Sequence, residues 1–301
     1  MMKEAQARGY GIFSATLPNL SLKNSRGMEL WAEGSEIEIF GVGRRPFYKI
    51  KKKLHFELSK AKAIFLRKDP PFDLTYLQHL YLLGQLRGRV YMMNDPVGIA
   101  AVSEKVFPFW FPEYIPKTCI TSSWEEAKAF STNFKKGVIL KPLNSSGGRQ
   151  VFKFSPQDSN LQIAFEALNP HGNQYVICQE FLPAVQKGDK RVILLGGQIL
   201  GAFARIPSKG SHRANLHSGG SLKKCSLSVR EKEISKAVGL VMLRYGIDFA
   251  GIDLIGEKLT EINVTSPMGL KEINSTQNIR SEKLWMDFVE WRIGSKNASP
   301  V

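Results

Sequence analysis

Three observations predict an α/β protein built from two or three lobes. The first hundred residues alternate strand-like and helix-like segments, a pattern typical of a parallel sheet covered by helices. Beyond residue 100, short apolar runs are joined by turns rich in Gly and Ser, which indicates hairpins. The length of 301 residues can bury a substantial core and exceeds what one small domain needs.

Local signals assign the N-terminal segments. A helical fragment over residues 3–8 is stopped by Gly9, and residues 62–68 (KAIFLRK) are a candidate buried strand. Asp73 can cap a helix that starts directly after it, because its carboxylate can accept hydrogen bonds from the first turn. Another short strand is expected at residues 90–96.

Capped helices and short strands follow. Ser123 and Glu126 form a capping-box pair before an amphipathic helix, and Ser228 and Glu231 form a second pair. The second helix carries one apolar stripe and is closed by Gly246. The expected strands lie at residues 137–143, 151–154 and 175–182 and on both sides of the Gly196–Gly197 turn, and a last helix is expected near residues 281–293.

Residues 250–267 (AGIDLIGEKLTEINVTSP) predict a hairpin. Two strand-like runs flank a Gly-Glu-Lys connection at residues 256–258, which is typical of a three-residue hairpin loop. That loop sets Ile255 opposite Leu259, and the apolar side chains of both strands then share one face.

The other face of this hairpin gathers three oxygen donors. Asp253 lies opposite Glu261 in the expected register, and Asn263 points the same way because side chains alternate along a strand. Like charges opposite each other repel, and Mg²⁺ would offset the repulsion because it prefers carboxylate and amide oxygens. An ordinary hairpin with a solvated polar face explains the same spacing, so both interpretations stay open.

The net charge of +15 admits nucleic-acid binding, anionic substrates or a generally basic proteome. The densest basic cluster, YKIKKK at residues 48–53, lacks the interleaved aromatic residues of a base-stacking platform. A solvated face or loop is therefore favoured, and no nucleic-acid partner is expected. Anionic small molecules explain part of the charge.

Cysteine usage and hydropathy indicate the cytoplasm. Cys119, Cys178 and Cys225 lie far apart in the sequence and match no metal-ligand spacing, which favours free thiols. The most aromatic stretch, residues 106–114, is broken by two prolines, and no run approaches a membrane span. The N-terminus lacks an apolar signal core. We expect a cytoplasmic protein with no membrane partner.

Residues 139–148 (ILKPLNSSGG) carry residue types that contact phosphate. Lys141 supplies charge at a strand end, and the backbone of Gly147 and Gly148 can approach phosphate closely and donate N–H groups. The lysine precedes the glycines and no helix follows, so this is not a Walker A loop. An edge-strand lysine before a plain hairpin turn explains the stretch equally well.

Further polar signals follow in the order in which a nucleotide site would use them. Gln179 to Leu182 leave a buried strand with an edge that suits a nucleobase, and Asp189 stands beside two cations. Arg205 and Arg213 bracket a loop rich in Gly, Ser and His. Each signal alone has an ordinary structural explanation. Their order makes sense if ATP lies between two small sheets, with lysines and a metal holding its phosphates from opposite sides.

With these residues identified, the chain resembles the ATP-grasp ligases, and closely the prokaryotic glutathione synthetase family. RKDPPFD at residues 67–73 and LTEINVTSP at residues 259–267 are together highly specific within the superfamily. The match runs in family order over nearly the whole chain. The other matching stretches are SEK before Val106, ILKP and the following GG (139–148), QEFLPAVQKGDKRV (179–192), ARIP (204–207), and RANL with GG (213–220).

The resemblance implies roles in four groups. The implied ATP-binding residues are Lys105, Lys141, Gly147, Gly148, Gln179, Glu180, Phe181, Leu182 and Asp189. The implied catalytic residues are Arg191 and Arg205, which stabilise the phosphorylated intermediate. The implied residues of the lid loop are Arg213 and Asn215. The implied ligands of Mg²⁺, with Mn²⁺ as a substitute ion, are Asp253, Glu261 and Asn263.

The resemblance also implies an ATP-grasp fold of the α/β (α+β) class in three parts. Residues 1–101 would form an N-terminal domain with a doubly wound parallel sheet, residues 102–182 a small central lid, and residues 183–301 a catalytic domain with an antiparallel sheet. The implied reaction joins γ-glutamylcysteine to glycine: ATP phosphorylates the cysteinyl carboxylate, and the glycine amine then displaces phosphate. Glutathione, ADP and phosphate are the implied products, and a homotetramer is the implied assembly.

Two departures from the family pattern carry their own expectations. The usual Asp-Gly-Met-Gly-Gly turn is Asn-Ser-Ser-Gly-Gly at residues 144–148, which is expected to alter closure of the small loop. The family's first strand and the start of its first helix have no counterpart, so a truncated N-terminal domain and altered subunit packing are expected.

Two alternatives stay open. Another ATP-grasp carboxylate–amine ligase would share the nucleotide and metal residues, but it should lack RKDPPFD and RANL together. A catalytically weakened, divergent family member is favoured by the missing strand and the altered turn, and disfavoured by the intact metal residues and arginines.

Overall fold

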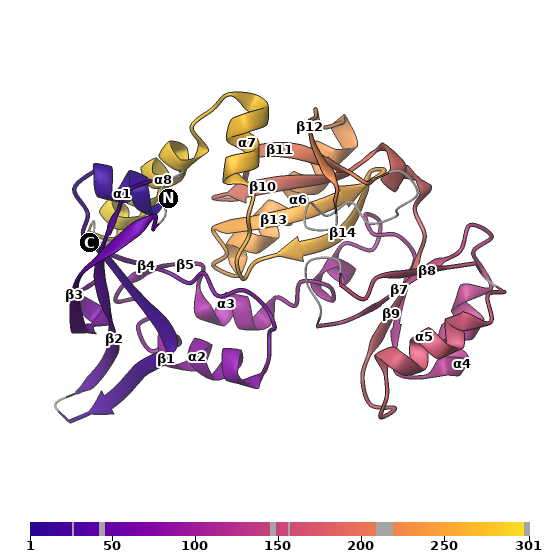
Figure 1. The fold of residues 1–301 in the computed structure, drawn as a ribbon, viewed down its shortest axis with the longest axis horizontal. Helices are drawn as coiled ribbons and strands as arrows, with labels where there is room; N and C mark the ends of the chain where they lie inside the picture. Colours follow the sequence, from indigo (N-terminus) through magenta and orange to yellow (C-terminus); the bar gives the residue numbers. More distant parts are fainter. Residues whose placement is uncertain (26, 42–45, 145–148, 156, 209–218, 298–301) are drawn as a thin grey trace.

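The structure is a computed structural model that describes the chain apart from residue 26, residues 42–45, 145–148, 156, 209–218 and 298–301, and the side chains of residues 295–297. Figure 1 shows three regions along the long axis. The first strands lie beside the first and last helices at one end, a five-stranded sheet occupies the middle, and a four-stranded sheet with two helices forms the other end. Within the described part of the chain, no helix has the length and apolar character needed to cross a membrane.

The N-terminal region contains a long antiparallel sheet followed by a short parallel pair. The antiparallel sheet has the order β1-β2-β3 and follows a short helix; the elements are α1 (Met2–Ala7), β1 (Ile12–Asn24), β2 (Met28–Ile39) and β3 (Tyr48–Glu57). Parallel pairing among the described residues is confined to β4 (Ala63–Phe65) and β5 (Tyr91–Met93). Among the described residues, the expected doubly wound parallel sheet is thus reduced to one pair, because those between 12 and 57 pair locally as antiparallel strands and contain no crossover helix.

The expectations for the basic cluster and the first caps are confirmed. Residues 48–53 lie on β3 and are all exposed, as a solvated face requires. Asp73 accepts a hydrogen bond from the Tyr76 backbone N–H at 2.8 Å and starts α2 (Leu74–Gly84). The short helix α3 (Pro96–Ala101) follows β5 and leads toward the middle of the molecule.

The middle of the sequence forms the four-stranded antiparallel sheet that lies at one end of the molecule in Figure 1. This sheet, called the central sheet below, has the order β6-β9-β7-β8 and packs with two helices. Its elements are β6 (Thr118–Thr121), α4 (Trp124–Ser131), β7 (Val138–Pro142), β8 (Phe152–Phe154), α5 (Asn160–Leu168) and β9 (Val176–Glu180). Leu140, Phe165 and Val176 belong to a core that these elements enclose among themselves. The three strands expected here from the sequence are therefore confirmed within two residues at each end.

Only half of the first expected capping box forms. Ser123 Oγ accepts a hydrogen bond from the Glu126 N–H at 3.4 Å and caps α4. The Glu126 carboxylate, however, accepts a hydrogen bond from the Thr121 hydroxyl at 2.6 Å. Thr121, at the end of the preceding strand, takes both groups of the missing half of the box. Its hydroxyl donates to the Glu126 carboxylate, and its Oγ1 accepts the hydrogen bond from the Ser123 backbone N–H.

The C-terminal region is an antiparallel sheet with the order β12-β11-β10-β13-β14. Its elements are β10 (Asp189–Leu195), β11 (Gln198–Ile206), β12 (Ser221–Lys224), α6 (Val229–Arg244), β13 (Phe249–Ile255), β14 (Lys258–Asn263), α7 (Leu270–Gln277) and α8 (Ser281–Asn297). The expected Gly196–Gly197 turn joins β10 to β11 with positive φ at both residues.

The hairpin of β13 and β14 has a shorter turn than predicted. Two residues, 256 and 257, make the turn with φ values of 55° and 64°, as a type I′ turn requires. This turn pairs Ile255 with Lys258, so the predicted pairing of Ile255 with Leu259 is wrong.

A register shift after Asp253 restores the predicted pairing of Asp253 with Glu261. One extra residue on one strand of an antiparallel pair moves the register back, and Asp253 then faces Glu261 as predicted. Asn263 pairs with Gly251, two residues further along the same ladder. The two carboxylates are therefore opposite each other despite the different turn.

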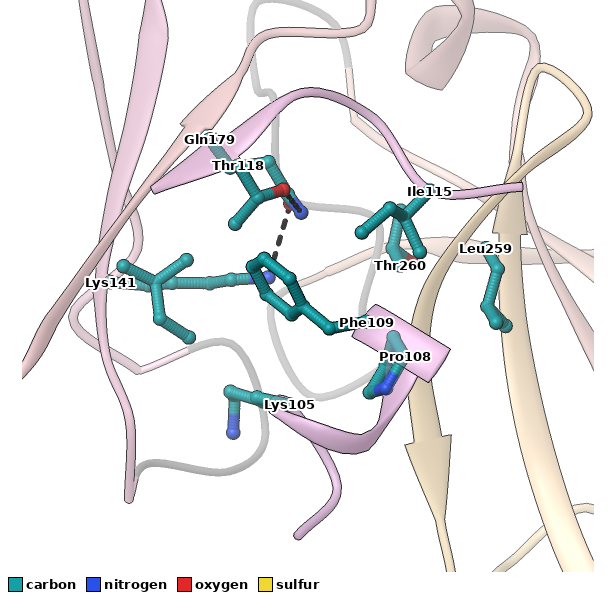
Figure 2. A pocket seen from close by; sticks show the side chains of 10 residues that line it. Lys105, Pro108, Phe109, Ile115, Thr118, Lys141, Gln179, Leu259 and Thr260 are labelled. Atoms are coloured by element: carbon teal, nitrogen blue, oxygen red, sulfur yellow. Dashed lines mark hydrogen bonds between the residues drawn. The ribbon is translucent and has the colours of Figure 1, made fainter. Parts of the chain in front are cut away.

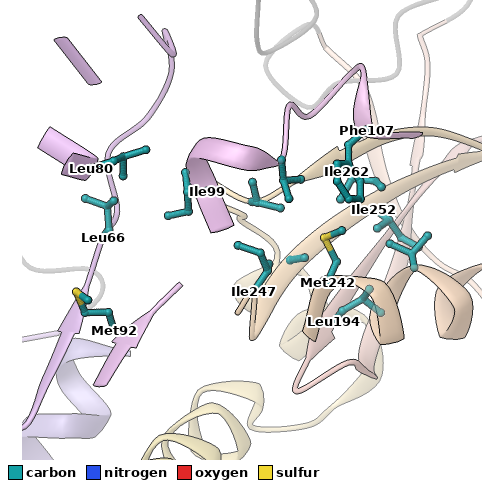
Figure 3. Packing of buried hydrophobic residues seen from close by; sticks show 14 of the residues in the cluster. Leu66, Leu80, Met92, Ile99, Phe107, Leu194, Met242, Ile247, Ile252 and Ile262 are labelled. Atoms are coloured by element: carbon teal, nitrogen blue, oxygen red, sulfur yellow. The ribbon is translucent and has the colours of Figure 1, made fainter. Parts of the chain in front are cut away.

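The N-terminal and C-terminal regions share one hydrophobic core. Figure 3 shows this cluster running from Leu66 and Leu80 across Ile99 of α3 to Ile252 and Ile262 of the five-stranded sheet. The described residues of the central sheet contribute nothing to it. The predicted domain boundaries at residues 101 and 182 stay predictions. The shared core joins the first of the three predicted domains to the last.

Replacing Ser228 by alanine tests the cap of α6. Ser228 Oγ accepts the Glu231 N–H at 3.2 Å, and the Glu231 carboxylate accepts the Ser228 N–H at 2.8 Å. Ser228→Ala removes the first of these bonds, so we expect the free energy of unfolding to fall by about 1 kcal/mol in urea denaturation followed by circular dichroism. Ser275→Ala, at an exposed position inside α7, is the control. An equal loss in both variants would contradict the assignment.

Candidate active site

A pocket that is partly open to solvent lies between the central sheet and the hairpin of β13 and β14. Phe109 and Ile115 supply apolar surface, while Lys105 and Lys141 supply positive charge (Figure 2). Gln179 adds an amide from β9. Apolar walls with a few converging polar groups are typical of a ligand site, and the two lysines favour an anionic ligand.

Lys141 is held in this pocket by a chain of hydrogen bonds. Its Nζ donates to Gln179 Oε1 at 3.2 Å, and Gln179 Nε2 donates to Thr118 Oγ1 at 2.9 Å (Figure 2). Thr118 Oγ1 in turn donates to the Pro116 carbonyl at 2.8 Å. Burial lowers the pKa of Lys141, and the Glu261 carboxylate opposes this shift. A bound anion would stabilise the charge that burial disfavours.

Cations balance both carboxylates of the hairpin. Arg191 binds Asp253 through two hydrogen bonds, from Nε at 2.5 Å and from Nη2 at 2.9 Å. Arg205 Nη2 lies 3.0 Å from Asp253 Oδ1, and Lys105 Nζ lies 3.1 Å from Glu261 Oε1. The repulsion expected from the sequence is thus offset by three cations of the chain itself.

Burial and ion pairing shift two pKa values in opposite directions. Burial acts to raise the pKa of Asp253, but Arg191 and Arg205 outweigh it and hold this pKa below its usual range. Burial raises the pKa of Asp189 to about 6, although Arg205 Nη2 lies 2.5 Å from its Oδ2. Asp189 Oδ1 and Arg205 Nε are buried without a hydrogen-bond partner among the described residues. One acceptor and one donor are therefore left unsatisfied beside the ion pairs of the hairpin.

Three oxygen donors, from Asp253, Glu261 and Asn263, lie together on the hairpin of β13 and β14. Asp253 and Glu261 are directly opposite, and Asn263 Nδ2 lies 3.5 Å from Asp253 Oδ2. Among the described residues, no group of three or more His, Cys, Asp or Glu side chains could hold a metal. A cation here would therefore be held by two carboxylates and one amide, a donor set that fits a hard divalent ion completed by substrate oxygens.

The four residues of the QEFL stretch are divided between the pocket and its support. Gln179 lines the pocket, whereas Glu180, Phe181 and Leu182 are not among its described lining residues. Phe181 is buried, and its backbone N–H donates to the Gly137 carbonyl at 3.1 Å. The stretch thus leaves β9, an inner strand of the central sheet, beside the residue that precedes β7.

Four predicted site residues fall on parts of the chain without a description. Gly147 and Gly148 lie outside the described residues, and so do Arg213 and Asn215. Their predicted roles stay predictions.

Sequence reasoning missed contacts that join distant segments. Cys119 lies directly opposite Cys178 across β6 and β9, and both thiols are free. Glu104 accepts hydrogen bonds from the segment that follows β14, although the sequence placed it only within a matching stretch. Burial and the Glu261 carboxylate raise the pKa of Glu104. No local pattern shows which strands pair across such separations.

Two family models match the chain. Residues 1–99 match the N-terminal domain of the prokaryotic glutathione synthetase, and residues 104–278 match the ATP-grasp domain of the same family. The glutathione synthetase of Vibrio parahaemolyticus is 36% identical over 297 residues, which cover 97% of this chain and 92% of that protein. The glutathione synthetase of Shewanella oneidensis is 36% identical over 296 residues, which cover 98% and 92%.

Solved structures match at the level of the fold. The ATP-grasp ligase PsnB in complex with a minimal precursor has a TM-score of 0.62 at 15% identity, covering 96% of this chain and 93% of that chain. The D-cycloserine synthetase DcsG has a TM-score of 0.58 at 14% identity, covering 80% and 86%. The ATP-grasp fold expected from the sequence is confirmed. Because both family models match in order and the relatives align over nearly the whole chain, it belongs to the prokaryotic glutathione synthetase family.

Proposed function

We propose that this chain is an ATP-dependent ligase that joins γ-glutamylcysteine to glycine and releases glutathione, ADP and phosphate. The observation that carries the proposal is that Lys141 of the central sheet and Lys105 line one pocket, while the Glu261 and Asp253 carboxylates act on the charge of Lys141 and are themselves paired with Lys105 and Arg191. The family membership and the glutathione synthetases that match over nearly the full chain support this choice of substrates.

The proposed place of ATP follows the pocket. Lys105 and Lys141 would contact its phosphates, and the apolar wall with Gln179 would hold the adenine. The backbone that runs from Glu180 to Leu182 would border the adenine. Asp189, whose Oδ1 has no hydrogen-bond partner among the described residues, would accept a bond from the ribose.

The proposed metal is Mg²⁺, with Mn²⁺ as a substitute, held by Asp253, Glu261 and Asn263. When bound, this ion would neutralise charge on the phosphates during phosphoryl transfer. Asp253 and Glu261 would then exchange their present partners for the ion, which would free Arg191 and Lys105 for phosphate oxygens.

The proposed chemistry has two steps. The cysteinyl carboxylate takes the γ-phosphoryl group of ATP, which forms an acyl phosphate and ADP. The glycine amine then attacks the acyl carbon, the C–O bond to phosphate breaks, and the amine loses a proton. Arg191 and Arg205 would stabilise the negative charge of the phosphorylated carboxylate. Shielding of this intermediate by Arg213 and Asn215 is carried over from the family resemblance alone.

The proposed setting is the cytoplasm, with small molecules as substrates. Free thiols at the three cysteines agree with a reducing compartment. A homo-oligomer, a tetramer by family resemblance, is the proposed assembly.

The proposed reaction predicts a strict dependence on all four components. Phosphate release should require ATP, Mg²⁺, γ-glutamylcysteine and glycine together, and glutathione should form in equal amount, as measured by a phosphate assay and by mass spectrometry. Glu261→Gln should abolish turnover with the circular dichroism spectrum unchanged, because the amide cannot supply the negative charge that the metal needs.

The control for this variant lies on the same hairpin. Glu257 is exposed at the turn, so Glu257→Gln should keep full activity. Turnover in Glu261→Gln at the wild-type rate would exclude this metal site, and a folded wild type that makes no glutathione would favour the divergent, inactive alternative.

The lowered pKa of Lys141 predicts a pH limit on nucleotide binding. The lysine is charged below its pKa and neutral above it, so the loss of charge begins at a lower pH than the usual lysine value of about 10.5. In calorimetry without peptide substrate, ATP affinity should fall as the pH rises from about 7 to 10.

Two variants separate Lys141 from other lysines. Lys141→Arg should bind ATP without this alkaline decline, because arginine stays charged. Lys187→Arg, at an exposed position, should behave like the wild type. The same decline in Lys141→Arg as in the wild type would assign the pH limit to a different group.

A further inference from the structure

Glu104 holds the backbone on both sides of Asn263. The Glu104 carbonyl accepts a hydrogen bond from the Ile262 N–H at 3.0 Å, just before Asn263. Its Oε1 accepts three more just after it, from the Val264 N–H at 3.0 Å, the Thr265 N–H at 3.2 Å and the Thr265 hydroxyl at 2.9 Å. One residue therefore fixes both neighbours of a proposed metal ligand.

The next residue along the chain fixes a second proposed ligand. Lys105 Nζ forms its ion pair with Glu261 Oε1, and Glu261 lies on the same strand two residues before Asn263. Glu104 and Lys105 thus hold β14 through its backbone and through a side chain. The segment that bears a proposed phosphate lysine is tied to the strand that bears two proposed metal ligands.

A carboxylate at this position does more than fill space. Three donors converge on one oxygen, and hydrogen bonds to a charged acceptor are stronger than those between neutral groups. The bonds fall where β14 ends, a place where a strand would otherwise fray. Loss of a group that orients metal ligands through hydrogen bonds typically costs about 10- to 100-fold in metal affinity.

We propose that Glu104 is a positioning residue for the metal–nucleotide site, because its hydrogen bonds fix how Asn263 and Glu261 present their oxygens to the cation. This inference rests on the proposed function. Glu104 need not touch ATP or the metal; it acts through Val264 and Thr265.

Calorimetric titration of ATP at a series of free Mg²⁺ concentrations, and once in EDTA, tests the proposal. The free Mg²⁺ needed for half-maximal ATP binding should rise about 10-fold in Glu104→Ala. Glu104→Gln keeps the length and one acceptor oxygen, so its shift should be smaller. ATP affinity in EDTA should stay within about 2-fold of wild type in each variant, because the inference concerns the cation site.

Thr265 provides the second arm of the test. Thr265→Val removes one of the three donors and should shift the Mg²⁺ requirement in the same direction, whereas Thr265→Ser keeps the hydroxyl and should restore it. The double variant Glu104→Gln/Thr265→Val should shift the requirement by less than the two single shifts combined, since both act on one contact.

Two controls separate positioning from stability and from charge. Ser228→Ala weakens the cap of α6, which contacts the hairpin at Glu257 of its turn and not at the end of β14 that Glu104 holds, and Glu125→Gln removes an exposed negative charge on α4. Both should keep the wild-type Mg²⁺ requirement.

The outcomes decide as follows. An unchanged Mg²⁺ requirement in Glu104→Gln and Thr265→Val, or an equal shift in Ser228→Ala, overturns the inference. A loss of ATP affinity of the same size with and without Mg²⁺ overturns it too. If Glu104→Ala does not fold, the Gln and Thr265 variants decide alone. A wild type that binds Mg²⁺ and ATP but makes no glutathione overturns the proposed function, while the Mg²⁺ shifts still decide this inference.

Discussion

A buried carboxylate, Asp253, faces a partly buried one, Glu261, across the hairpin of β13 and β14, and the arrangement of the site follows from the need to balance their charges. Burial makes an unpaired charge costly, and two like charges at cross-strand distance add repulsion. Asp253 is paired with Arg191 from the adjacent strand β10 and with Arg205 from β11, the next strand beyond it, and Glu261 is paired with Lys105 from the segment that leads into the central sheet. The hairpin carboxylates therefore bind cations from three segments, and one of these cations, Lys105, lines the pocket.

The packing of apolar residues separates the two walls of this pocket. The central sheet encloses its own core, whereas the N-terminal and C-terminal regions share another. A small cluster that includes Phe181, Val185 and Ile255 lies between the central sheet and the hairpin. A shift of the central sheet would thus disturb few buried contacts, and it would carry Lys141 toward or away from the carboxylates. This division suits a site that must admit a ligand and then exclude water.

Features set by neighbouring residues could be predicted from the sequence, and features set by distant pairing could not. The caps at Asp73 and Ser228, and the facing of Asp253 and Glu261, depend on spacings of a few residues. The two-residue turn could not be predicted from the facing of Asp253 and Glu261. The register shift after Asp253 cancels the effect of the shorter turn, so a two-residue and a three-residue turn give the same facing pair. The sequence predicted alternating strands and helices for the whole N-terminal region, a pattern that its local signals support over residues 62–96. The described residues between 12 and 57 instead form three long antiparallel strands. The contacts of Thr118 and Glu104 link segments that only the tertiary fold brings together.

The present ion pairs also bear on how the site can accept a polyanion and a cation together. Arg191, Arg205 and Lys105 are each paired with a carboxylate of the site, whereas Lys141 bonds to a neutral amide. Under the proposed function, Lys141 can meet a phosphate without breaking an ion pair. Lys105 and Arg191 can do so only as Glu261 and Asp253 gain another positive partner. A phosphate alone would take Lys105 from Glu261 and Arg191 from Asp253, and a cation alone would take these two carboxylates from Lys105 and Arg191. When both enter, Lys105, Arg191, Glu261 and Asp253 each exchange one opposite charge for another, so binding of each ligand favours binding of the other.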